Sequence, residues 1–157
     1  MLLTGGQIVA ESLVRQGVPY LLGIPGHGCL ALLDAFVGRT DIEVLQVRHE
    51  QSAVHIADGY ARVTGRPLAT YTSIGPGAAN TVVGLGSAYA DSIPALVLCG
   101  DVHTYMFGRG VLQELERDHW ANLARVFGPV TKRYWQASRP NQLPGVMRNA
   151  FRTMLGG

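Results

Sequence analysis

Charge is scarce in this sequence. Only 15% of the residues are charged, against about 25% in an average soluble domain, whereas the hydrophobic share of 47% is ordinary. We therefore expect a partner to cover part of the surface, as in a homo-oligomer. The net charge of +2 comes without a basic run, which argues against nucleic-acid binding and against a basic membrane-surface helix and favours small-molecule partners.

Long apolar runs and paired cysteines are also missing. No stretch approaches the roughly 18 apolar residues that span a bilayer, and the opening Met-Leu-Leu-Thr-Gly-Gly lacks the regions of a signal peptide. We therefore expect a cytoplasmic protein without membrane contact. Cys29 and Cys99 form no C-x-x-C pair, and Cys99 ends an apolar run, so a buried reduced thiol is expected there rather than a disulfide.

What the sequence does contain is an alternation of helical and strand-like segments. The 157 residues suit one domain. Thr4 and Gln7 have capping-box spacing at a helix start, and Gly17 ends that helix. Apolar periodicity and breakers predict strands at 20–22, 43–47, 68–73, 95–99 and 130–135, and helices at 30–36, 51–64, 75–90, 119–127 and 142–155. The pattern predicts an α/β fold with a mostly parallel sheet flanked by helices on both faces.

Ligands of such sheets bind beyond the carboxyl ends of the strands. Four loops therefore become candidates, beginning near Gly23, Arg48, Ser73 and Gly100. The first contains Gly26-x-Gly28-x-x-Ala31 between a strand and a helical segment, which is the skeleton of a dinucleotide-binding fingerprint. Pro25 stiffens that turn and the following helix is short, so a dinucleotide-binding module stays an alternative hypothesis.

Glu50 is the acidic residue that attracts most interest. It stands where the second strand gives way to a helix, and an acidic side chain there can simply complement the helix dipole. However, the helix beyond it is unusually apolar, with Ala53, Ala57 and Ala61 at four-residue spacing that lets another helix approach closely. Partial desolvation raises the proton affinity of a carboxyl group, which suits a hydrogen bond to a ring nitrogen.

The remaining polar residues near these loops are less distinctive. His49 and His55 miss the H-E-x-x-H spacing, so no metal site is expected. Ser73 lacks the first glycine of a nucleophile elbow, and an ordinary hydroxyl is preferred. The segment Gly75-Pro76-Gly77, followed by Asn80, either presents backbone groups to a ligand or serves as a plain helix entry. His27 is as compatible with a structural loop role as with a substrate contact.

Four motifs, in order and at matching spacing, closely resemble acetolactate synthase and its thiamine diphosphate-dependent relatives, the pyruvate oxidase-like enzymes. The resemblance runs across nearly the whole chain, and the segment 49–62 is the most specific part. It implies the thiamine diphosphate-binding fold, in its N-terminal pyrimidine-binding domain, of enzymes that decarboxylate 2-oxo acids such as pyruvate. The motifs are Gly23-Ile24-Pro25-Gly26, Arg48-His49-Glu50-Gln51 with Ala57-Asp58-Gly59-Tyr60-Ala61-Arg62, Gly75-Pro76-Gly77-Ala78-Ala79-Asn80, and Ala90-Asp91-Ser92-Ile93-Pro94.

The resemblance also implies residue roles. Glu50 is the catalytic residue, because the matching glutamate bonds a pyrimidine nitrogen of thiamine diphosphate and so activates the cofactor to its ylide. His27 and Gln113 are implied to face the substrate. Leu112 stands where acetolactate synthases usually have Phe, and Ser73-Ile74 where they have Thr-Ser, so the particular 2-oxo acid stays open. The implied cofactor-binding residues are Ile24, Pro25, Glu50, Ser73, Pro76 and Asn80.

Half of such an active site is missing from this sequence. The family holds the diphosphate and its Mg²⁺ through a Gly-Asp-Gly motif on a separate domain, and here only Gly100-Asp101-Val102 appears. We therefore expect residues 1–157 to form the pyrimidine domain alone, without the central and diphosphate-binding domains, an excised and inactive half of a lyase or transferase rather than a natural small subunit. A flavin, FAD, is left open for the full-length enzyme. A non-catalytic assembly domain is the other alternative.

Overall fold

The computed structural model describes residues 2–115 and 122–156. Their strands form one all-parallel sheet in the order β2-β1-β3-β4. The strands are β1 (Tyr20–Gly23), β2 (Glu43–Gln46), β3 (Leu68–Thr72) and β4 (Ala95–Cys99). β1 and β3 occupy the centre, and all five residues of β3 are buried. The predicted parallel sheet and the four strands before residue 100 are confirmed.

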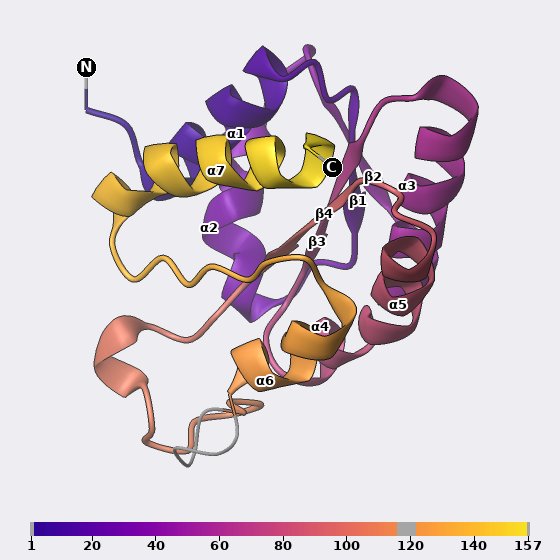
Figure 1. The fold of residues 1–157 in the computed structure, drawn as a ribbon. Helices are drawn as coiled ribbons and strands as arrows, with labels where there is room; N and C mark the ends of the chain where they lie inside the picture. The colour runs from indigo at the N-terminus through magenta and orange to yellow at the C-terminus, as the bar shows by residue number, and fades with distance from the viewer. Residues whose placement is uncertain (1, 116–121, 157) are drawn as a thin grey trace.

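Helices cover both faces of this sheet, as predicted (Figure 1). On one side lie α1 (Gly5–Arg15), α2 (Leu30–Leu33) and α7 (Leu143–Leu155), and on the other lie α3 (Glu50–Thr64) and α5 (Val82–Ala90). The shorter helices α4 (Pro76–Ala79) and α6 (Leu123–Phe127) lie near the carboxyl ends of the strands. Short 3-10 turns complete the described elements at His27–Cys29, Asp34–Phe36, Thr104–Met106, Gly128–Val130 and Pro140–Gln142.

The chain makes these helices for local reasons. The capping box at Thr4 and Gln7 is present, with both reciprocal hydrogen bonds. At the start of α3 the ring of His49 accepts a hydrogen bond from the Gln51 amide, and Gly65 ends the helix in the left-handed conformation at φ +69°. Glu50 is the first residue of α3, one position before the predicted start at 51 and at the helix N-terminus, where the sequence placed it.

Two predicted elements differ in the structure. The helix expected at 75–90 is divided into α4 and α5, because the Thr81 hydroxyl bonds the Ala78 carbonyl at 2.7 Å and competes with the helical ladder. The strand expected at 130–135 is wrong. That segment leaves a 3-10 turn at Val130 and continues without regular secondary structure, and Tyr134 stacks on Phe127, with ring centroids 6.2 Å apart. Of the helix expected at 119–127, residues 123–127 are helical and 119–121 lie outside the described residues.

An ion pair network braces the far end of α3. Arg62 contacts Asp58 one turn earlier at 2.9 Å and Asp91 after α5 at 2.5 Å. The hydrogen bonds that Arg62 donates to the carboxylates of Asp58 and Asp91 raise the pKa of Arg62. Asp58 and Arg62 belong to the motif at 57–62, and Asp91 belongs to the motif at 90–94. In this fold the three residues connect the ends of α3 and α5.

We predict that replacing two glycines, one in α3 and one packed against it, by alanine changes the free energy of unfolding in opposite directions. Gly84 in α5 touches this helix so closely that a Cβ would lie 2.6 Å from the Val54 Cβ, whereas a Cβ on the exposed Gly59 of α3 would meet nothing within 4 Å. Gly84→Ala should lower the free energy of unfolding by about 1–3 kcal/mol through overpacking. Gly59→Ala should raise it by about 0.5–1 kcal/mol. Urea unfolding of both variants tests the pair, and equal effects would contradict this packing.

Candidate functional site

Glu50 lies at the edge of the sheet where the strands end. Its side chain is half-buried, and its Oε2 accepts a hydrogen bond of 2.9 Å from Nδ2 of Asn80. Asn80 immediately follows α4, and from there its amide reaches the carboxylate. The loops after β2 and β3 thus meet through a charge-assisted hydrogen bond.

Gly77 packs closely against this carboxylate. A Cβ on Gly77 would lie 3.1 Å from Oε1 of Glu50 and 2.9 Å from Oγ1 of Thr72. Any larger residue would crowd both oxygens. Thr72 ends β3, is fully buried, and was not singled out from the sequence. An inward hydroxyl at the end of an apolar strand was the signal that could have identified it.

Two further glycines pack the loop after β1 onto the loop after β3. A Cβ on Gly26 would lie 2.5 Å from the Cβ of Ser73, and one on Gly28 would lie 2.3 Å from Cγ2 of Ile74. Ser73 Oγ also accepts a long hydrogen bond, 3.4 Å, from the Gly28 amide. Ile74, which departs from the acetolactate synthase pattern, is buried in this contact.

Gln113 reaches the same edge through its backbone. Gly75 has φ +54°, and a Cβ there would lie 2.0 Å from the Gln113 carbonyl oxygen. Gln113 itself has φ +62°, a left-handed conformation rare for a residue with a side chain, and its side chain is exposed.

Glu114 holds the loop that carries Gln113. This glutamate is buried, and its carboxylate accepts hydrogen bonds from the amides of Gly108 at 2.7 Å, Gly110 at 2.8 Å and Val111 at 3.3 Å. Sequence reasoning gave Glu114 no role, although a glutamate within a glycine-containing loop is typical of such an anchor.

The other predicted residues lie at this edge without a contact to the carboxylate. Ile24 and Pro25 follow β1, which lies between β2 and β3 in the sheet; Ile24 is half-buried and Pro25 exposed. Pro76 opens α4 and is exposed. His27 is exposed in a 3-10 turn, and no hydrogen bond among the described residues joins it to Glu50.

The loop with Gly26 and Gly28 lacks the geometry that a dinucleotide-binding module requires. Gly26 and Gly28 are packed against Ser73 and Ile74 and do not face an open phosphate site. Ala31 lies in α2, which has only four residues. A phosphate-binding fingerprint needs a helix whose aligned N-terminal amides face the ligand, so the structure disfavours the dinucleotide-binding alternative.

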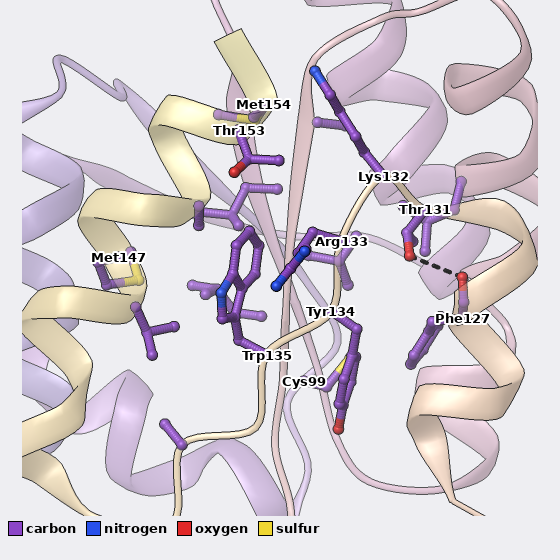
Figure 2. Close-up of a pocket in the computed structure, with 18 of the residues that line it drawn as sticks. Cys99, Phe127, Thr131, Lys132, Arg133, Tyr134, Trp135, Met147, Thr153 and Met154 are labelled. Atoms are coloured by element: carbon purple, nitrogen blue, oxygen red, sulfur yellow. Dashed lines mark hydrogen bonds between the residues drawn. The ribbon is translucent and has the colours of Figure 1, made fainter. Parts of the chain in front are cut away.

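The large cavity lies elsewhere. It measures about 1260 Å³ and is lined by residues of β4, α7 and the segment 131–137, Trp135 and Met147 among them (Figure 2). Glu50, Thr72 and Asn80 are not among its lining residues. Cys99 and Asp101 are, and burial raises the pKa of both groups, that of the Cys99 thiol to about 12. Both cysteines are free thiols.

The described residues contain neither a candidate membrane span nor a candidate metal cluster. None of the helices within 2–115 and 122–156 is long and apolar enough to cross a membrane. Across the same residues, no three His, Cys, Asp or Glu side chains gather as a metal site would require.

The arrangement at the Glu50 edge can bind a flat, partly polar group. A carboxylate and an amide are held together at the edge of the sheet, short loops locked by glycine contacts surround them, and a buried hydroxyl also lies against Gly77 without a partner among the described residues. Such a site can exchange a proton with a ligand nitrogen or oxygen placed against Glu50.

The matching family model and the similar proteins agree with each other. Residues 3–121 match the family model described as thiamine pyrophosphate enzyme, N-terminal TPP binding domain. The chain is 38% identical over 150 residues to acetolactate synthase isozyme 3 large subunit of Escherichia coli, covering 96% of this chain and 25% of that protein. It is 36% identical over 147 residues to a probable acetolactate synthase large subunit of Methanocaldococcus jannaschii, covering 94% of this chain and 24% of that one. The chain thus spans about a quarter of the length of these relatives.

The Glu114 anchor yields a prediction that needs no ligand. Glu114→Gln replaces one acceptor oxygen by an NH₂ group that faces backbone amides. The exchange protection of the Gly108, Gly110 and Val111 amides should then fall about tenfold or more, since a hydrogen bond to a charged group contributes about 1.5–3 kcal/mol. Hydrogen exchange measured by NMR tests this. Glu43→Gln, at an exposed position on β2, is the control, and unchanged protection in Glu114→Gln would contradict the anchor.

Proposed function

We propose a function for this chain from one premise: it belongs to the family of thiamine pyrophosphate enzymes, whose N-terminal binding domain it matches over residues 3–121. In this proposal the chain is the pyrimidine-binding half of a thiamine diphosphate-dependent 2-oxo acid decarboxylase or carboligase, similar to acetolactate synthase. Glu50 is the residue that activates the cofactor.

The observation that carries the proposal is the environment of Glu50. The carboxylate starts a helix, is half-buried, and is oriented by Asn80 from the next loop. Because Gly77 has no side chain, its backbone can lie close to Oε1, and the Thr72 hydroxyl beside it has no partner among the described residues. The polar edge of an aminopyrimidine suits this set of polar atoms.

Each residue has a distinct task in this site. Bound thiamine diphosphate supplies the carbon nucleophile that attacks a 2-oxo acid. Glu50 holds and passes a proton at its carboxylate, and Asn80 keeps that carboxylate aimed at the ring. Ile24, Pro25, Ser73 and Pro76 form the walls of the pyrimidine pocket, whereas His27 and Gln113 stand on the substrate side.

The complete enzyme needs more than this chain. We propose that a further domain, of the same or a partner chain, binds the diphosphate with Mg²⁺, that the assembly is a cytoplasmic homo-oligomer acting on pyruvate or a similar 2-oxo acid, and that the chain alone is inactive. The chain's span of about a quarter of its relatives supports the need for other domains. The low charge of 15% and the half-buried state of every β4 residue support a covered surface.

Replacing Glu50 by Gln in the full-length enzyme tests the central assignment. Glutamine keeps the size and can still bond Asn80, but it cannot donate or accept a proton during turnover. We expect the rate of pyruvate consumption, measured with thiamine diphosphate and Mg²⁺, to fall by about 10²–10⁴, the range for a positioned acid–base group.

Glu43→Gln is the matched control, because Glu43 lies on the exposed part of β2, at the opposite end of the strand that leads to Glu50. It should leave the rate unchanged. If Glu50→Gln turned over pyruvate as fast as the control, Glu50 would not be the activating residue.

A further inference from the structure

Thr72 carries a hydroxyl that the fold does not use. The residue is 0% exposed, yet its Oγ1 has no hydrogen-bond partner among the described residues. The two other buried threonines are bonded, Thr70 to the Leu96 carbonyl at 3.4 Å and Thr81 to the Ala78 carbonyl at 2.7 Å. Leaving a buried hydroxyl unpaired costs free energy, so a threonine in place of a valine at this position calls for a partner outside the fold itself.

The free hydroxyl and the carboxylate of Glu50 both approach Gly77. The point where a Gly77 Cβ would lie is 2.9 Å from Thr72 Oγ1 and 3.1 Å from Glu50 Oε1, so both oxygens lie against the same side of Gly77. Asn80 bonds the other oxygen, Oε2. No described residue donates a hydrogen bond to Oε1.

We propose that Thr72 is a positioning residue for Glu50, which donates its hydroxyl proton to Oε1 when the site is loaded, while Asn80 donates to Oε2. A carboxylate offers about four acceptor sites on its two oxygens. One donor on each oxygen fixes the plane of the carboxylate and still leaves acceptor sites for the ligand. This inference rests on the proposed function, because it assigns Thr72 a role only through the task of Glu50.

Thr72→Val should raise the stability of the isolated chain and lower the turnover of the full-length enzyme. Valine keeps the branched shape and removes the unpaired hydroxyl, so the isolated chain should unfold at a higher urea concentration than the wild type. In the full-length enzyme the same change should lower kcat about tenfold, which corresponds to about 1.4 kcal/mol, with KM for pyruvate unchanged. Thr72→Ser keeps the hydroxyl and should restore kcat.

Thr70→Val is the matched control on the same strand. Its hydroxyl is bonded within the fold, so the isolated chain should lose stability while kcat in the full-length enzyme stays at the wild-type value. If Thr72→Val did not fold, Thr72→Ala, which removes the hydroxyl without adding a methyl group, should give the same loss of kcat and the same recovery with serine.

Two results would overturn the inference. One is a wild-type kcat in Thr72→Val, and the other is a loss of stability together with kcat that serine does not restore. Glu50→Gln, assayed beside them, separates the two proposals. If Glu50→Gln abolishes turnover and Thr72→Val does not change it, only the role of Thr72 fails; if Glu50→Gln turns over normally, the proposed function fails and takes the role of Thr72 with it.

Discussion

Close backbone contact between loops is the constraint on which this structure depends. At the carboxyl edge of the sheet Gly26 and Gly28 meet the loop after β3, Gly75 meets Gln113, and Gly77 lies against Glu50, each at a distance that excludes a Cβ or forces a neighbour to move. Loops without secondary structure are usually mobile. Here they are locked to one another by contacts that only glycine permits, and so they can hold polar side chains in defined positions.

The hydrogen bond between Asn80 and Glu50 is a product of this arrangement. The helix after β3 is interrupted at Asn80 and Thr81, where the Thr81 hydroxyl bonds the Ala78 carbonyl. Both residues keep right-handed helical dihedral angles. Asn80 lies at the junction of α4 and α5, and from there its amide holds one oxygen of the Glu50 carboxylate.

Much of the fold could be predicted from the sequence, since capping residues, glycine stops and short apolar runs are local signals. The capping box at Thr4, the start of α3 at Glu50 and the parallel order of strands are examples. The prediction for 130–135 was wrong because its apolar and aromatic residues resemble those of a strand, whereas a strand also needs a neighbouring strand to pair with. In the structure Tyr134 packs on Phe127 instead, and local sequence patterns do not encode which partner a segment meets.

The site was predictable only in part, for a related reason. Glu50 and Asn80 could be named from the motifs that contain them, but their hydrogen bond joins residues 30 positions apart and needs three-dimensional contact. Thr72 and Glu114 were missed because their importance lies in what surrounds them. The Thr72 hydroxyl has no partner among the described residues, and the Glu114 carboxylate has three backbone donors. Neither condition can be inferred from the residue type.

The brace at Arg62 has a consequence for distant parts of the chain. α3 has 15 residues and is therefore about 22 Å long, with Glu50 at one end and the Asp58–Arg62–Asp91 network near the other. The helix acts as a lever arm, so that a tilt of about 5° at the braced end would displace the carboxylate by about 2 Å. The turn between α5 and β4, at the other end of the helix, thus helps to fix the position of the Glu50 carboxylate.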